Sequence, residues 1–199
     1  MLDQEKSALR RSILTVLRGL DPAVRVRKSA AIASRLVAQK LFVDAVEVLG
    51  FYPMSEEVDV LPILRSALEA GKRVWLPRIE AGRLVFHRVE DLGTGMERHS
   101  YGMREPDAAL PAFVPEDAAG FVLVVTPGVA FDSRGNRLGR GKGYYDSFLR
   151  SARAASKAPI LAVAVAYAEQ LVAGVPHGRH DETVDAVATD RELITLGRP

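Results

Sequence analysis

Residues 121–150 read FVLVVTPGVAFDSRGNRLGRGKGYYDSFLR, and this stretch contains an apolar run, a glycine-rich turn and an amphipathic segment in succession. Residues 121–126 have the length and composition of a buried strand, and residues 144–154 have apolar positions at helical spacing. A second apolar run follows at 159–166. A strand, a helix and a further apolar strand in this order predict a parallel strand pair with a helix packed across it.

The same pattern occurs earlier in the chain. Residues 45–52 (AVEVLGFY) are predicted to form a strand, 60–70 a helix that ends near Gly71, and 73–76 a second strand. We therefore expect an α/β protein with a largely parallel sheet that is covered on both faces, in one domain spanning 1–199. Ligands of such sheets bind beyond the carboxyl ends of the strands, so the loops at 53–57 and 127–143 should share one rim.

The segment at 83–115 is harder to interpret. A strand is predicted at 84–89, but the rest of the segment carries Gly93, Gly95, Gly102 and three prolines. This composition indicates irregular structure or a small lid over the site.

Composition excludes several functional classes. The chain has 199 residues and no cysteine, which rules out thiol nucleophiles, zinc–cysteine clusters and iron–sulfur ligation. Its 27 basic and 25 acidic residues are too balanced for a dedicated duplex DNA binder. No Gly-x-Ser-x-Gly elbow or HExxH motif occurs. The opening residues MLDQEK do not indicate a transit or secretory signal, and the longest apolar runs are shorter than a membrane span, so we expect a cytoplasmic protein without membrane contact.

The first predicted helix, 6–20, carries two cations on its inward side. Lys6 and Arg10 lie one turn apart within or beside the apolar stripe, whereas Arg11 and Arg18 project away from it. They either pack their stems against the protein with their charges in water, or point at an anionic ligand. Asp21-Pro22 then predicts the start of a second helix that runs to about residue 40.

The loop before the last predicted helix combines glycines with cations. Gly135, Gly139, Gly141 and Gly143 alternate with basic residues, namely Arg137, Arg140 and Lys142. Glycines let a backbone approach a ligand closely, and backbone N–H groups before a helix favour phosphate. The spacing matches neither a Walker A loop nor a dinucleotide-binding fingerprint. A flexible basic loop for single-stranded nucleic acid is the alternative.

Residues near this loop extend the candidate site. Tyr144 and Tyr145 diverge by about 100° on a helix, so one can pack inward while the other faces a planar ligand. Asp146, in the first turn, either complements the helix dipole or binds Mg²⁺. Asp185 is a candidate second carboxylate, and Glu57 either caps a helix or contributes a carboxylate at the carboxyl end of the first strand.

Several motifs together resemble one family. NRLGRGKGYYD at 136–146, preceded by PGVAFD at 127–132, resembles the signature of the 5-formyltetrahydrofolate cyclo-ligases, also called methenyltetrahydrofolate synthetases. The resemblance extends to the Lys6-x-x-x-Arg10 pair, to FYPMSEEVD at 51–59, to YGMREP at 101–106 and to VPHGRHDETVDAV at 175–187. It implies a three-layer α/β/α sandwich, in agreement with the pattern above.

The resemblance also implies an activity: ATP-dependent conversion of 5-formyltetrahydrofolate into 5,10-methenyltetrahydrofolate, with ATP and Mg²⁺ as cofactors. By motif, Arg140 and Lys142 would act on the transferring phosphoryl group and Asp146 and Asp185 would bind Mg²⁺. Tyr52 stands where the family pattern is often aliphatic, and Glu105 matches a recurrent residue to which we assign no role. The implied ATP-binding residues are Lys6, Arg10, Arg137, Gly139, Arg140, Gly141, Lys142, Gly143, Tyr144 and Tyr145, and the implied folate-binding residues are Tyr52, Glu57, Arg140, Gly141, Lys142, Gly143 and Tyr144.

The implied chemistry explains the many cations. Transfer of the ATP γ-phosphoryl group to the formyl oxygen creates an iminium phosphate, which the second folate nitrogen attacks before phosphate leaves. The protein must align the groups and offset their charge. We expect small-molecule substrates, no nucleic-acid partner and a monomer. Two alternatives are an RNA-binding module and an ATP-independent enzyme of similar fold, such as a sugar-phosphate isomerase or an acyl-CoA transferase.

Overall fold

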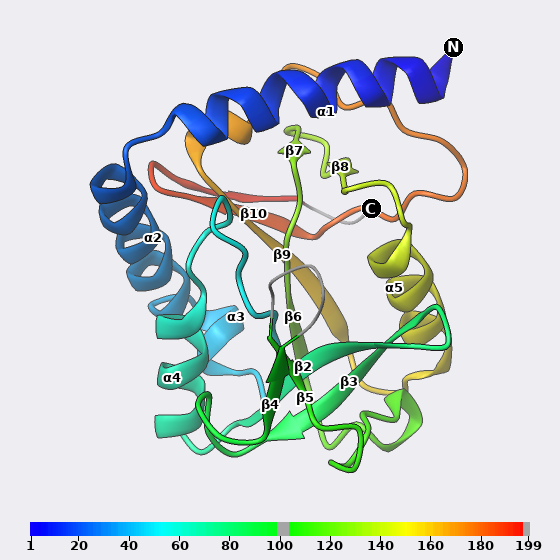
Figure 1. Ribbon diagram of the computed structural model, residues 1–199. Coiled ribbons are helices and arrows are strands. Elements are labelled where there is room, and N and C mark those ends of the chain that lie inside the picture. Colours follow the sequence, from blue (N-terminus) through cyan, green and yellow to red (C-terminus); the bar gives the residue numbers. More distant parts are fainter. Residues whose placement is uncertain (99–103, 197–199) are drawn as a thin grey trace.

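A computed structural model describes residues 1–98 and 104–196, and it contains a seven-stranded sheet in the order β11-β10-β9-β6-β1-β2-β3 (Figure 1). His99 and the first half of the YGMREP motif, residues 101–103, lie outside the described residues. The helices are α1 (Leu2–Gly19), α2 (Pro22–Val37), α3 (Lys40–Val43), α4 (Leu61–Glu69), η1 (Pro115–Asp117), α5 (Tyr144–Ala155) and η2 (Ala168–Gln170). The strands are β1 (Glu47–Leu49), β2 (Arg73–Glu80), β3 (Arg83–Val89), β4 (Met96–Arg98), β5 (Arg104–Pro106), β6 (Val122–Thr126), β7 (Ala130–Phe131), β8 (Arg137–Leu138), β9 (Ile160–Ala166), β10 (Ala186–Thr189) and β11 (Leu193–Thr195).

The sheet is mostly parallel, as predicted. Strands β2, β1, β6, β9 and β10 pair in parallel, and β3 and β11 add antiparallel edges. Strand β2 is longer than predicted, because it continues to Glu80 and pairs with β3 through a tight turn. Ala81 and Gly82 make that turn with φ values of 44° and 76°.

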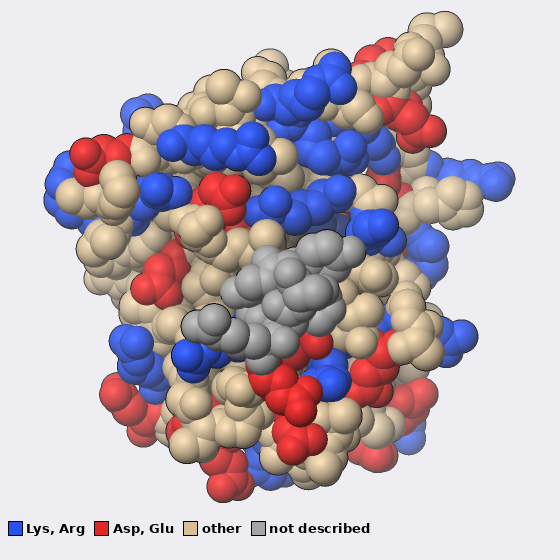
Figure 2. All heavy atoms as spheres, viewed as in Figure 1, with Lys and Arg blue, Asp and Glu red and all other residues tan. Residues whose placement is uncertain are grey.

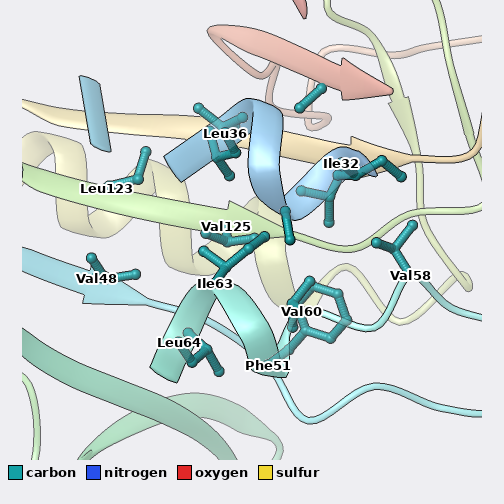
Figure 3. Close-up of a cluster of buried hydrophobic side chains, with 14 of the residues drawn as sticks. Ile32, Leu36, Val48, Phe51, Val58, Val60, Ile63, Leu64, Leu123 and Val125 are labelled. Atoms are coloured by element: carbon teal, nitrogen blue, oxygen red, sulfur yellow. The ribbon is translucent and has the colours of Figure 1, made fainter. Parts of the chain in front are cut away.

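Helices cover both faces, which confirms the α/β/α arrangement. On one face, α1, α2 and α4 pack against alternate residues of the strands. Figure 3 shows this core, where Ile32 and Leu36 of α2 and Ile63 and Leu64 of α4 lie near Val125 of β6. On the opposite face, Leu149 and Ala152 of α5 pack against the other alternate set of strand residues, among them Val122, Val124, Ala162 and Ala164. The alternation follows from the two-residue period of a strand.

The region at 83–115 is more regular than predicted. It contains β3 and a separate two-stranded sheet, β4–β5. This β4–β5 sheet is close to β2, since Arg78 of β2 donates hydrogen bonds to Glu97 (2.7 Å) and to the carbonyl of Pro106 (2.9 Å). The strand predicted at 84–89 is thus confirmed, and the prediction of irregular structure was wrong for Met96–Arg98 and Arg104–Pro106 but agrees with the segments at 90–95 and 107–111.

The topology fixes where a ligand can bind. The chain passes from β1 to β2 on one side, and β6 then pairs with β1 on the other side. The loops after β1 and β6 consequently diverge at a switch point of the sheet, where α/β proteins bind ligands. Helix α1 crosses the carboxyl-terminal side of the strands, above β7 and β8 (Figure 1). Among the described residues, no helix combines the length and apolar character that crossing a bilayer requires.

Candidate active site

A cavity of about 570 Å³ lies at this switch point. Its wall comes from the α1 helix, the loop after β1, strands β2, β3 and β5, and the glycine loop with the start of α5. Both loops that were predicted to share a rim contribute to it. The lining residues that carry charge are Asp3, Lys6, Arg10, Glu57, Arg104, Glu105, Arg137, Arg140, Lys142, Asp146 and Asp181.

The two cations of α1 point into the wall of the cavity. The Lys6 ammonium lies 2.5 Å from Oδ2 of Asp181, and Arg10 Nε donates to the carbonyl oxygen of Gly139 at 2.8 Å. Burial alone would raise the pKa of Asp181, but the Lys6 ammonium and the Gly178 amide hold it below its usual value. The two charges are therefore bound to other parts of the protein at the cavity wall and not left in water, while their role toward an anionic ligand stays a prediction. Figure 2 shows the wider setting, with Lys and Arg gathered on the upper part of this face, where α1 crosses.

The glycine loop has the backbone conformation that its composition suggested. Gly141 has φ +102° and Gly143 has φ +69°, and Gly143 directly precedes α5. A Cβ at Gly141 would lie 3.7 Å from the Arg10 guanidinium. Lys142 is exposed at the cavity and makes no hydrogen bond or ion pair with another described residue. The loop thus places main-chain atoms at the cavity, together with the Lys142 ammonium, which has no partner among the described residues.

Arg137 forms part of the wall beneath this loop. Its side chain is 3% exposed, its guanidinium donates to Oδ1 of Asp146 at 2.8 Å, and it lies 5.6 Å from the Tyr145 ring. Tyr145 packs inward against Phe86, and burial raises the pKa of its hydroxyl. Tyr144 is half-buried and also lines the cavity. The two tyrosines therefore diverge, as their helical spacing predicts.

Glu57 joins the two rim loops. Its Oε1 accepts from Nε and Nη2 of Arg140, both at 3.3 Å, and its Oε2 accepts from the Met54 amide at 3.0 Å. Its backbone carbonyl accepts from the buried Tyr167 hydroxyl at 3.0 Å, which also contacts Ser29 Oγ at 3.1 Å. The position of Glu57 is thus fixed by its own turn and by the core below it.

A buried carboxylate fixes the start of the glycine loop. Asp132 is fully buried and accepts hydrogen bonds from the amides of Arg134, Asn136 and Val175 and from Nδ2 of Asn136. Desolvation opposes ionisation, but these hydrogen bonds hold the pKa of Asp132 below its usual value. The motif PGVAFD therefore supplies an anchor for the β7–β8 turn, and β8 leads directly into the site.

Comparisons with known proteins identify the family. The family model for 5-formyltetrahydrofolate cyclo-ligases matches residues 2–190. The chain belongs to this family. The 5-formyltetrahydrofolate cyclo-ligases of Mycolicibacterium smegmatis and Escherichia coli K12 are each 30% identical to it, over 207 and 179 residues. These alignments cover 100% of both chains for the former, and 88% of this chain and 95% of the relative for the latter.

Solved structures agree with the assignment. The 5,10-methenyltetrahydrofolate synthetase of Aquifex aeolicus is 33% identical, has a TM-score of 0.81 and is matched over 98% of this chain and 95% of its own. A synthetase from Mycoplasma pneumoniae shares the fold, with a TM-score of 0.72 at 21% identity, over 94% of this chain and 99% of its own. This protein is therefore an enzyme of the cyclo-ligase family, which sets aside the RNA-binding module and the ATP-independent enzymes considered above.

The cavity of this cyclo-ligase contains one of the two carboxylates predicted for magnesium. Asp146 lines it, but Asp185 does not. Oδ2 of Asp185 accepts from Arg153 and from the Ala162 amide, both at 2.7 Å, so this carboxylate links α5 to the sheet. In the described part of the chain, no group of three or more His, Asp or Glu is arranged to hold a metal ion.

Four of the charged lining residues were not assigned to the site from the sequence, namely Asp3, Arg104, Glu105 and Asp181. Asp181 lies in VPHGRHDETVDAV, and Arg104 and Glu105 lie in YGMREP, so the family motifs did contain them. The Arg104 guanidinium lies 5.6 Å from the ring of Tyr52, which is half-buried beside the cavity. The cyclo-ligase motifs carried the signal, but the spacing of these residues carried no information on which of them face the cavity.

Proposed function

We propose that this enzyme closes 5-formyltetrahydrofolate to 5,10-methenyltetrahydrofolate in its cavity, with conversion of ATP to ADP and phosphate. One observation carries the proposal. Lys6, Arg10, Arg140 and Lys142, from two distant segments, line the same cavity as Glu57. A triphosphate requires several cations, and a pterin ring has N–H donors that suit a carboxylate.

The proposed nucleotide site uses α1 and the glycine loop. Lys6, Arg10 and Lys142 would contact the phosphates, and the amides of Gly139, Gly141 and Gly143 would lie along them. Arg137, Tyr144 and Tyr145 would complete the wall around the nucleotide. Support comes from the left-handed backbone of Gly141 and Gly143, which only glycine adopts readily.

The proposed folate site adjoins the nucleotide site. Glu57 would bind the pterin by hydrogen bonds, Tyr52 would contact its ring, and residues 140–144 would touch both substrates. Arg140 and Lys142 would stabilise the charge that develops as the γ-phosphoryl group moves to the formyl oxygen. The resulting iminium phosphate would be attacked by the second folate nitrogen, so that no phosphorylated side chain forms. Isolation of a phosphorylated residue during turnover would contradict this route.

Two carboxylates of the cavity are suited to bind the Mg²⁺ ion that accompanies ATP. Mg²⁺ is usually bound through one or two protein carboxylates, with water and substrate phosphate completing its shell. Oδ1 of Asp146 accepts from Arg137 and the Glu182 amide, and Oδ2 of Asp181 accepts from Lys6 and the Gly178 amide. Each carboxylate keeps its second oxygen without a hydrogen bond from another described residue. We therefore propose Asp146 and Asp181 as its ligands; the ion would supply charge neutralisation at the phosphates.

The deciding experiment mixes the purified protein with 5-formyltetrahydrofolate, ATP and Mg²⁺ and follows the near-ultraviolet absorbance of the methenyl product. We expect the absorbance to rise with equimolar release of ADP, and not to rise when ATP is omitted. A correctly folded protein that forms no product would overturn the proposal. A cytoplasmic monomer remains our prediction, which cell fractionation and light scattering test.

A further inference from the structure

Glu105 is a buried carboxylate on the wall of the cavity. It lies in strand β5, is 5% exposed and lines the same cavity as Glu57 and Lys142. Its Oε1 accepts one hydrogen bond, from the Ile79 amide at 3.2 Å. Within residues 1–98 and 104–196 it makes no other hydrogen bond and no ion pair, so its second oxygen has no protein partner there.

The surroundings of Glu105 do not neutralise it. Arg78 is within electrostatic range of Glu105, but the hydrogen bonds of Arg78 go to Glu97 and to the Pro106 carbonyl. Oε2 of Glu105 receives no hydrogen bond from a described residue and is not sealed from solvent, so it is open to the cavity, where a ligand can supply the missing donor.

The neighbouring lining residues indicate which part of a ligand lies there. Pro77, Ile79 and Leu84 line the cavity together with Glu105, so this part of the wall is largely apolar, with Arg104 as the cation of the same strand. The phosphate-binding cations are instead on α1 and on the glycine loop. A flat, uncharged ring that presents N–H groups fits an apolar wall with one carboxylate, whereas a phosphate would be repelled by it.

We propose that Glu105 binds the folate substrate, accepting a hydrogen bond from an N–H group of the reduced pterin through Oε2. This inference rests on the proposed function and adds a second carboxylate contact to that of Glu57. Glu57 lies at the rim and is shared with Arg140, whereas Glu105 lies on strand β5 with its second oxygen uncommitted. Two carboxylates on separate elements can fix the orientation of the ring, which one contact at the rim cannot do.

The test is Glu105→Gln. The amide oxygen can still accept from Ile79, but an NH₂ group replaces the second acceptor and faces the substrate donor. Loss of a hydrogen bond to a charged group predicts a rise of about tenfold or more in the KM for 5-formyltetrahydrofolate, with the KM for ATP unchanged within about twofold. Calorimetric titration with 5-formyltetrahydrofolate in the absence of ATP should show the same loss of affinity.

Glu97→Gln is the matched control. Glu97 lies on the partner strand β4, forms an ion pair with Arg78, and does not line the cavity. We expect its kinetics and folate affinity to match those of the wild type. Melting temperatures of both variants show whether the fold is retained, and Glu105→Asp provides a second variant that keeps the charge if Glu105→Gln does not fold.

The outcomes separate the two proposals. If the wild type forms no methenyl product, the proposed function fails. If the wild type is active and Glu105→Gln keeps the folate KM and affinity of the wild type, only the role of Glu105 is overturned. An equal rise in both KM values, or a lower melting temperature without a selective folate effect, would show that Glu105 serves only to hold β5 against β2.

Discussion

Oε1 of Glu57 lies 3.3 Å from Nε and from Nη2 of Arg140, so a carboxylate of the loop after β1 is paired with a cation 83 positions later in the glycine loop. The Arg140 side chain is 37% exposed, and an ion pair that accessible contributes less than about 1 kcal/mol to stability. The pair therefore contributes little to the fold, whereas in the proposed folate site a bound pterin would share Glu57 with Arg140.

Glu57→Gln should consequently impair folate binding more than folding. We expect the KM for 5-formyltetrahydrofolate to rise about tenfold, while the melting temperature changes by less than about 3 °C. Glu56→Gln is the control, since Glu56 is also near Arg140, at 3.9 Å, but does not line the cavity. Equal effects of the two substitutions on the folate KM would argue against a pterin contact at Glu57.

Lys142→Ala should abolish turnover and leave the fold intact. Lys142 is exposed and has no partner among the described residues, so its removal leaves no buried group unpaired. We expect the rate of methenyl formation to fall at least about a hundredfold, as for loss of a group that stabilises developing charge. Lys157→Ala, which removes an exposed lysine from the turn after α5, should leave the rate unchanged. A large drop in melting temperature for Lys142→Ala would show that the loop lysine has a structural role instead.

Gly141→Ala tests the backbone of the glycine loop. With φ at +102°, an alanine there is strained by about 1–3 kcal/mol, so the loop should relax and lose its present shape. We expect the KM for ATP to rise at least about fivefold by loss of the aligned amides. Gly19→Ala, at the last residue of α1 where a Cβ meets nothing within 4 Å, should not lower activity. If Gly141→Ala binds ATP as the wild type does, the backbone of the glycine loop does not take part in nucleotide binding.

The Asp132 anchor predicts a pH dependence of stability. Because its folded pKa is held below the unfolded value of about 3.9, Asp132 stabilises the fold above that value and loses this contribution as pH falls through the folded pKa. Asp132→Asn, whose NH₂ group would face donors, should lower the free energy of unfolding by about 2–4 kcal/mol at neutral pH. Urea unfolding at several pH values should show this difference shrinking below about pH 4. A difference independent of pH would mean that Asp132 is not ionised in the folded protein.

The magnesium dependence of the rate separates Asp146 and Asp181 from Asp185. Asp146→Asn and Asp181→Asn should each raise the Mg²⁺ concentration needed for half-maximal rate. Asp185→Asn should leave that concentration unchanged and lower the melting temperature, because Asp185 pairs with Arg153 beneath α5. A selective rise in the magnesium requirement of Asp185→Asn would restore it as a ligand.

Much of the fold could be predicted from local pattern, because buried parallel strands and amphipathic helices each have a recognisable period. Element ends were less predictable. Within the apolar run at 45–52, only Glu47–Leu49 pairs with neighbouring strands, because a strand ends where its neighbours stop pairing. Likewise, β2 extends to Glu80 because β3 folds back on it, which the run at 73–76 alone does not indicate.

The candidate site was predictable where one segment carried the chemistry, as in the glycine loop. It was not predictable where the packing of distant segments decides which side chain faces the cavity. Asp181 and Asp185 are four positions apart in one motif, yet only Asp181 lines the cavity. Asp181 contacts Lys6, and no local spacing encodes a contact across 175 positions.

The contact between Lys6 and Asp181 also has a consequence for the order in which the cavity is assembled. A ribosome produces α1 first, but the carboxylate that holds its lysine emerges only after almost the whole sheet has been synthesised. Until then, Lys6 lacks the carboxylate that holds it in the folded protein, and the wall of the cavity is incomplete. We therefore expect the proposed nucleotide site to be completed only in the final stage of folding.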